Sequence, residues 1–406
     1  DVVAWANANM SDKGYSVVYK RQGEDKSQKK IEKPTITPIS AKRDVQSDYL
    51  VAIQQSEVAP IAPVFVDYER DLGRSKLDSG VEVLYKRNET NEPFSFIYRH
   101  DFGTQSIKSM ALAADYFELL GTAEKSAEEI QRELYDLACD FQIVTDLNKT
   151  YIAIGGLSEN MEKAMKIVEE YIANVEGDDD VLREVKNDIA QQRLNAKASQ
   201  QENFRALQRY CFYGKEYARK QTLSNKELRN LTSEELLANI KQLPNIKHRV
   251  MYYGPESLNN LVGSLYSAHR VGDNLIDLKS EPTPSKAVTK PNVLFAQYDA
   301  KQVYYMQYSC REQDKWNISN SPIGTLYNNY FSGGMNSIVF QEMREARGLA
   351  YSAQAQLTLP VHKTIPYTFT AFIATQNDKM KQAIEAFDEI INTMPESEAA
   401  FNVAKE

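Results

Sequence analysis

An arginine and a tyrosine seven residues apart, Arg344 and Tyr351, are the strongest candidates for a functional site in this sequence. A guanidinium offers several N–H donors in a fixed fork, and a neutral phenol can donate a hydrogen bond to an oxygen on which negative charge develops. Gly348 lies between them and can end a helix in the left-handed conformation, which would release Tyr351 into a strand. The spacing also fits a structural pair, with Arg344 at a helix C-terminus and Tyr351 packed on a sheet.

The four histidines do not form a metal-binding pattern. A zinc site built on one helix needs two histidines a single turn apart, so that both reach the same ion. Here neighbouring histidines are separated by at least 21 residues. We interpret each of them as a surface or hydrogen-bonded structural residue; they are His100, His248, His269 and His362.

The cysteines and paired glycines carry no recognisable chemistry of their own. Cys139, Cys211 and Cys310 lie far apart without C-x-x-C spacing, so we interpret them as small buried apolar residues, and a disulfide has no support. Gly333-Gly334 belongs to no phosphate-binding frame and predicts a tight turn.

The charge balance argues against a nucleic-acid partner. Lys and Arg number 48 against 56 Asp and Glu, a net charge of −8. No basic block is wide enough to follow a phosphate backbone, and we interpret the basic run at 26–33 as solvated linker. No apolar run approaches the ~18 residues of a membrane span. Residues 1–20 lack the regions of a signal peptide.

We expect four segments along the chain. Residues 1–22 read as the tail of a missing half, with a short helix near Trp5 and a strand at Tyr15–Tyr19. Residues 23–75 read as a Pro-containing linker. Two α+β units follow, at 76–280 and 290–406.

The first unit should alternate strands with capped helices. Strands are expected at 81–85, 95–98, 141–145, 149–155 and 248–253, with a turn at 88–92 joining the first two. Helices are expected at 109–120, after the cap at Ser126, at 160–175, and after the caps at Asp178, Ser224 and Thr232.

The second unit repeats this order. Strands are expected at 293–297 and 303–309, then a helix at 324–331, a helix at 337–347, two strands and a helix at 378–394. Residues 153–165 align with 371–383, and 178–188 with 396–406, which implies two weakly similar copies. In this alignment the second copy stops early, so the chain is expected to be truncated at both ends.

This order, with Phe331–Ser337 ahead of the Arg344 and Tyr351 pair, resembles the carboxy-terminal half of the insulinase/pitrilysin family of zinc metallopeptidases over residues 76–406. The resemblance implies a half clamshell of two similar α+β domains, each an antiparallel sheet flanked by helices. In the family, two such halves close over an unfolded peptide, and only the amino-terminal half holds zinc, through an H-x-x-E-H helix. The resemblance gives Arg344 and Tyr351 contacts to the bound peptide, with Arg347 as their solvated neighbour.

The resemblance also places a degenerate zinc site in the first unit. When Gly121-Thr122 is aligned with the Gly-Thr that follows the family's zinc helix, Leu112, Asp115 and Tyr116 replace the His, Glu and His that bind zinc and activate water. We interpret Asp115 as a surface carboxylate. No metal or other cofactor is expected in this chain, and zinc is expected in the missing half.

A third zinc ligand is not expected on the helix that follows the Asp178 cap either, because its Glu184 and Asp188 fit a solvated face.

We therefore interpret the chain as the non-catalytic, substrate-binding half of a bacterial zinc metalloendopeptidase, inactive alone, that degrades peptides or unfolded proteins inside a closed chamber. Its expected partners are the amino-terminal catalytic half, in the same chain or as a separate subunit, and peptide substrates. The alternatives are a catalytically dead structural or assembly subunit of the same fold and a free-standing peptide-binding module. The resemblance suggests a periplasmic or cell-envelope location; cleavage specificity and oligomeric state do not follow from the sequence.

Overall fold

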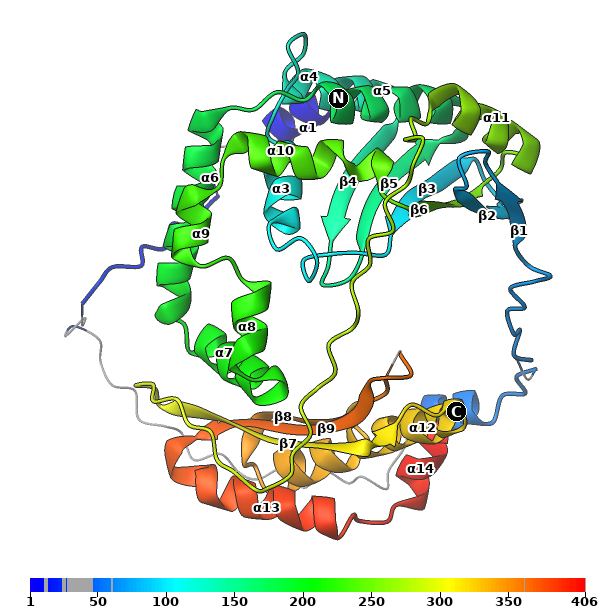
Figure 1. Cartoon of the computed structure of the whole chain (residues 1–406). Coiled ribbons are helices and arrows are strands. Elements are labelled where there is room, and N and C mark those ends of the chain that lie inside the picture. Colours follow the sequence, from blue (N-terminus) through cyan, green and yellow to red (C-terminus); the bar gives the residue numbers. More distant parts are fainter. Residues whose placement is uncertain (11–13, 24–26, 28–46, 60, 361, 406) are drawn as a thin grey trace. The chain divides into compact units, whose positions relative to one another are not determined.

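The computed structural model describes residues 1–10, 14–23, 27, 47–59, 61–360 and 362–405 (Figure 1). The chain forms two compact units, Asp1–Phe65 and Val66–Glu406. Within the described ranges, every helix is too short or too polar to cross a membrane.

The compact unit Asp1–Phe65 contains two short helices, α1 (Val2–Asn9) and α2 (Asp48–Gln54). The strand expected at Tyr15–Tyr19 is wrong: these residues join no sheet, and the Val18 side chain is 91% exposed. A strand needs a hydrogen-bonding neighbour, and nothing pairs with this segment among the described residues. The basic run at 26–33, except residue 27, lies outside the described residues, as do 34–46 of the expected linker.

The compact unit Val66–Glu406 begins with a six-stranded mixed sheet, which we call the first sheet. Its strands are β1 (Gly73–Lys76), β2 (Glu82–Arg87), β3 (Pro93–His100), β4 (Cys139–Thr145), β5 (Thr150–Leu157) and β6 (His248–Gly254). They lie in the order β1-β2-β6-β3-β5-β4. The pair β2–β6 is parallel, so the expectation of a wholly antiparallel sheet is wrong here. Because β6 inserts between β2 and β3, residues 88–92 connect strands that are not neighbours.

Helices lie between and after the strands of this sheet, and several of them have side-chain caps. They are α3 (Met110–Phe117), α4 (Ala127–Asp136), α5 (Met161–Asn174), α6 (Asp179–Lys197), α7 (Gln200–Tyr213), α8 (Lys215–Gln221), α9 (Asn225–Asn230), α10 (Ser233–Lys241) and α11 (Leu258–Ala268), with short 3-10 turns η1 (Ser158–Asn160) and η2 (Leu243–Asn245). The capping boxes predicted at Ser126, Ser224 and Thr232 are formed, and the Asp178 side chain caps α6. These caps satisfy helix N–H groups that would otherwise lack partners.

A second sheet has three antiparallel strands in the order β7-β9-β8. They are β7 (Gln302–Lys315), β8 (Ala350–Thr358) and β9 (Pro366–Gln376). The strand expected at 293–297 is wrong, because this segment pairs with no described strand and Val293 is 92% exposed. The α-helices of this part are α12 (Ser321–Ser332), α13 (Met380–Asn392) and α14 (Glu398–Lys405), with the π-helix η4 (Phe340–Ala346) and 3-10 turns η3 (Ile318–Asn320) and η5 (Asn377–Lys379).

The two faces of the second sheet differ. One face packs against α13 in a core that includes Phe331, Met343, Ile373 and Phe387 (Figure 1). On the other face the Phe204 ring of α7 lies 5.4 Å from the Tyr304 ring of β7. Helix α7 covers only part of this second face. A ligand can therefore reach the part that α7 leaves uncovered.

The internal repeat is visible in the element order. Strand β5, turn η1 and helix α5 correspond to β9, η5 and α13. Helix α5 begins at Met161 and α13 at Met380, whereas the sequence alignment pairs Met161 with Lys379. The two copies therefore match one residue later than the alignment placed them.

Candidate functional site

The structure brings Arg344 and Tyr351 together. The Arg344 guanidinium carbon lies 4.7 Å from the centroid of the Tyr351 ring and 4.9 Å from that of Phe340. A guanidinium over an aromatic face is attracted by the ring quadrupole. The Tyr351 side chain is 80% exposed, and its hydroxyl has no hydrogen-bond partner within the described residues. Arg344 Nε lies 3.6 Å from Glu345 Oε1, so the pair presents the remaining N–H donors of Arg344 and the phenol of Tyr351 to a ligand.

A left-handed turn at Gly348 positions this pair. Arg344 lies in the last turn of η4, and Gly348 has φ +56°, as expected for a glycine that ends a helix. The Gly348 N–H donates to the Arg344 carbonyl at 3.1 Å, and the Leu349 N–H donates to the Met343 carbonyl at 3.0 Å. These two bonds close the helix end and direct the chain into β8.

The start of β8 is irregular. The β8–β9 register shifts between Ala350 and Ser352, so Tyr351 occupies a β-bulge. A bulge re-aims a side chain that regular pleating would send to a sheet face. The buried Thr375 hydroxyl donates to the Leu349 carbonyl at 2.6 Å and fixes the strand just before Tyr351. Neither the bulge nor the π-helix η4 gives a signal in the sequence.

Arg347 is exposed, as expected, but it also forms two ion pairs. Its Nη1 lies 2.8 Å from Glu389 Oε2 and its Nη2 3.6 Å from Glu342 Oε2. The hydrogen bond from Arg347 lowers the pKa of the Glu389 carboxyl. Arg347 therefore ties η4 to α13.

The degenerate zinc positions do not fit a metal. Leu112 and Tyr116 are both buried in α3, and Leu112 has no lone pair to offer. The Tyr116 hydroxyl donates to the Asp178 carbonyl at 2.8 Å and accepts from the Asp178 N–H at 2.9 Å, with Ser233 Oγ at 2.7 Å. Tyr116 thus joins α3 to the starts of α6 and α10.

The carboxylate residues near these positions are exposed. Asp115 is exposed on α3, and Glu184 and Asp188 are exposed on α6, as expected. Among the described residues, no three His, Cys, Asp or Glu side chains are grouped so that they could hold a metal ion.

Three histidines that are distant in sequence meet at the first sheet: two lie on its strands, and His269 follows helix α11. His100 and His248 face each other across β3 and β6, and the His269 ring stacks on the buried Tyr98 ring at 4.3 Å. The buried Glu169 of α5 completes this group, which we call the histidine cluster. The interpretation of these three as hydrogen-bonded structural residues fits their contacts, but their grouping was missed, because it depends on β6 inserting beside β3.

The hydrogen bonds of the histidine cluster fix where its protons lie. His248 Nδ1 is 2.7 Å from the Ile246 carbonyl, which can only accept, so Nδ1 carries the proton and Nε2 is an acceptor. His269 Nε2–H donates to His248 Nε2 at 2.8 Å, and His269 Nδ1 lies 2.6 Å from Glu169 Oε1. A further proton on His248 Nε2 would set two N–H donors against each other.

Comparisons with known proteins address the family. Residues 258–406 match a family model described as the peptidase M16 inactive domain. These residues are therefore similar to a peptidase M16 inactive domain. The resemblance to the carboxy-terminal half of an insulinase/pitrilysin peptidase is thereby confirmed. No curated protein matches the chain in sequence.

Solved structures confirm the α+β fold class. A peptidase M16 inactive domain from Pseudomonas fluorescens has 17% identity and a TM-score of 0.63, with 82% of each chain covered. A protease from Helicobacter pylori has 12% identity and a TM-score of 0.61, also with 82% of each covered. The periplasmic protease PqqL from Escherichia coli has 15% identity and a TM-score of 0.66; the match covers 99% of this chain but 42% of PqqL.

We predict that the histidine cluster makes the chain sensitive to acid. Burial lowers the pKa of His248 from 6.5 to about 4 and that of His100 to about 3. Between pH 6.5 and 4 the unfolded chain binds more protons than the folded chain, so stability falls as the pH falls and is fully present above pH 6.5. The loss for His248 alone should be on the order of 3 kcal/mol.

Urea unfolding at pH 7, 6, 5 and 4 measures this loss. His248→Gln should reduce the slope of unfolding free energy against pH in that window, whereas His362→Gln, a change at an exposed histidine, should leave the slope as it is. Equal slopes for the His248 variant and the unmodified chain would contradict the prediction.

We also predict that Gly348→Ala destabilises the second sheet by about 1 kcal/mol, because a Cβ strains the left-handed conformation. A Cβ at Gly348 would meet no atom within 4 Å, so the cost isolates backbone strain from crowding. Gly263→Ala is the matched control: its Cβ also meets nothing within 4 Å, but it lies inside α11. That change should stabilise by roughly 0.5–1 kcal/mol. Urea unfolding compares the two, and a stabilising Gly348→Ala would contradict the assignment of the turn.

Proposed function

We propose that this chain is the substrate-binding, non-catalytic half of a zinc metalloendopeptidase that cuts peptides or unfolded proteins inside a closed chamber. The observation that carries the proposal is the Arg344 and Tyr351 pair, stacked and accessible on a peptidase M16 inactive domain. The proposed partner is an amino-terminal half that holds the zinc. The match to 42% of PqqL supports a longer assembly, since that protein is described as a protease.

In this proposal each side chain acts according to its chemistry. The Tyr351 phenol donates to the carbonyl oxygen of the scissile bond as negative charge develops on it. The guanidinium of Arg344 lies over the rings of Phe340 and Tyr351, and its N–H groups that do not face Glu345 donate to peptide carbonyls. The first sheet domain supplies no metal chemistry, because Leu112 and Tyr116 fill the zinc positions.

Tyr351→Phe is expected to lower kcat by on the order of 10²-fold or somewhat less, with little change in KM, because an oxyanion donor acts mainly in the transition state. Stability should not change, since the Tyr351 hydroxyl has no partner in the described chain. Arg344→Ala should both raise KM and lower kcat, because its donors contact the peptide before bond cleavage begins. Steady-state kinetics on one fluorogenic peptide, with the zinc half present, measures these effects.

Arg347→Ala is the control for the arginine. It removes contacts to Glu389 and Glu342, so it should cost less than about 1 kcal/mol of stability and leave kcat and KM unchanged. Unchanged kinetics in both the Tyr351 and the Arg344 variants would remove the pair from the mechanism. If associated halves with bound zinc cut no unfolded peptide, the structural or assembly role would replace the proposal.

A further inference from the structure

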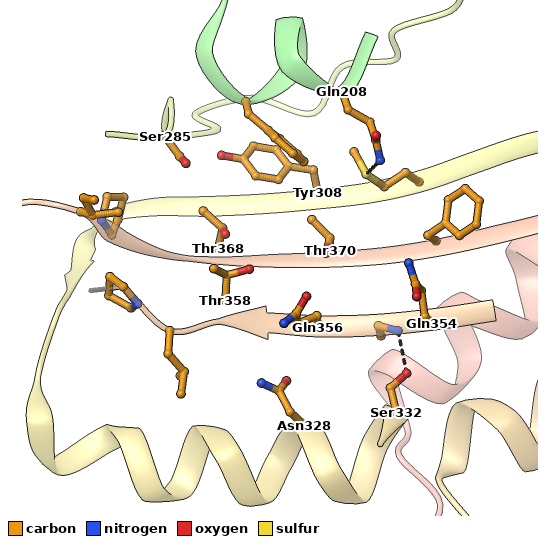
Figure 2. A pocket seen from close by; sticks show the side chains of 18 of the residues that line it. Gln208, Ser285, Tyr308, Asn328, Ser332, Gln354, Gln356, Thr358, Thr368 and Thr370 are labelled. Atoms are coloured by element: carbon orange, nitrogen blue, oxygen red, sulfur yellow. Dashed lines mark hydrogen bonds between the residues drawn. The ribbon is translucent and has the colours of Figure 1, made fainter. Parts of the chain in front are cut away.

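A groove of about 730 Å³ lies along β8, between helix α7 and helix α12 (Figure 2). None of the residues that line it is charged, although 26% of the chain is. Amides and hydroxyls dominate its floor, where Figure 2 shows Gln354, Gln356, Thr358, Thr368 and Thr370 on two adjacent strands. An uncharged polar surface of this size is unusual in so charged a chain.

The sheet register explains why these side chains form one surface. Gln356 pairs with Thr370 and Thr358 with Thr368 across β8 and β9, and directly paired residues share a face of a sheet. Ala371, next to Thr370, points to the opposite face and is part of the apolar core. The polar surface is therefore the outer face of a sheet whose inner face is fully packed.

These groove side chains have free hydrogen-bonding capacity. Within the described chain, no protein group bonds the side chains of Gln354, Gln356, Thr358 or Thr370. Their amides and hydroxyls can both donate and accept, as the N–H and C=O groups of a peptide backbone do. The groove thus offers complementary partners to a neutral, hydrogen-bonding ligand.

The edge of β8 beside the groove is already occupied. Asn328 of α12 bonds both backbone groups of Leu357 at 2.8 Å, and Ser332 accepts from the Ala355 N–H at 2.8 Å. A ligand therefore cannot add to the sheet as a further strand at these residues. It must lie over the face that carries Gln354 and Gln356.

The far wall of the groove is aromatic. The Phe212 ring of α7 lies 4.7 Å from the Tyr308 ring of β7, and Gln208 bonds the Met306 sulfur. Burial raises the pKa of the Tyr308 hydroxyl well above its ordinary value, so this wall carries no charge near neutral pH. Apolar or small polar side chains can pack here, while a charged side chain would lose its hydration without gaining a partner.

We propose that this groove binds an extended stretch of peptide whose side chains are uncharged. The proposal rests on the proposed function, because the groove follows Tyr351 along the same strand and so continues the peptide-contacting surface. Gln354, Gln356 and Thr358 repeat every two residues, at roughly 7 Å, which is also the repeat of an extended peptide. The groove would then select which segments of an unfolded substrate reach Tyr351.

Fluorescence anisotropy on this 406-residue chain tests the groove without the zinc half. Three labelled peptides of equal length are compared: one of Ser, Thr, Asn and Ala, and two in which alternate residues are Lys or Glu. The neutral peptide should bind at least tenfold more tightly than both charged peptides. Equal or tighter binding of either charged peptide would overturn the proposal, as would failure of the neutral peptide to bind.

Charge substitutions locate the binding. Gln356→Lys should weaken binding of the neutral peptide and strengthen binding of the Glu peptide. Gln356→Glu should strengthen binding of the Lys peptide. Gln142→Lys, at an exposed glutamine of β4 in the first sheet, should leave all three affinities unchanged. If the Gln142 and Gln356 variants behave alike, the peptide binds elsewhere and the groove has no such role.

Two further arms separate this proposal from its rivals. Displacement of the neutral peptide by a neutral oligosaccharide at similar concentration would indicate a glycan site and overturn the assignment. If Gln356 variants alter binding but Tyr351→Phe and Arg344→Ala leave turnover unchanged, the groove stands and the proposed mechanism fails. If turnover falls in those variants while the groove variants bind all peptides normally, the groove assignment fails and the mechanism stands.

Discussion

The left-handed turn at Gly348 is the constraint on which the candidate site depends. It separates η4, which ends at Ala346, from β8, which begins at Ala350, and the Arg344 guanidinium carbon lies 4.7 Å from the centroid of the Tyr351 ring. A non-glycine residue would adopt this conformation only with strain. The hydrogen bonds of Leu349 with Met343 and Thr375 then attach the turn to the core of the second sheet.

The two sheets use their polar residues in opposite ways. In the first, Tyr116 is buried and bonded to Asp178 and Ser233, and His248, His269 and Glu169 are bonded in a separate buried group. In the second, the Tyr351 hydroxyl and the amides of Gln354 and Gln356 are accessible and lack partners in the described chain. Buried polar groups need partners to be tolerated, whereas groups that bind a ligand must be left free. This contrast fits a scaffold domain and a binding domain.

Charged side chains around the second sheet lie outside the groove and not in it. Ion pairs join the helices that flank the second sheet away from the groove. An example is the pair of Arg347, just after η4, with Glu389 of α13. None of the residues that line the groove is charged, and beyond its end the Arg344 guanidinium of η4 lies over the Tyr351 ring of β8. A substrate would therefore meet hydrogen-bonding groups first and one fixed positive charge beside the phenol. Such an arrangement favours recognition of the peptide backbone over recognition of charged side chains.

The sequence by itself determined the order of most elements, the helix caps, the internal repeat, the family and the candidate pair, because capping boxes, apolar periodicity and a helix-ending glycine are local signals. It could not place β6 between β2 and β3, nor remove the expected strands at 15–19 and 293–297, since a strand exists only where another strand pairs with it. The meeting of His100, His248 and His269 follows from that placement. The bulge at Tyr351, the bonds of Arg347 and the groove likewise came only from the tertiary structure, because each depends on contacts between residues far apart in the chain.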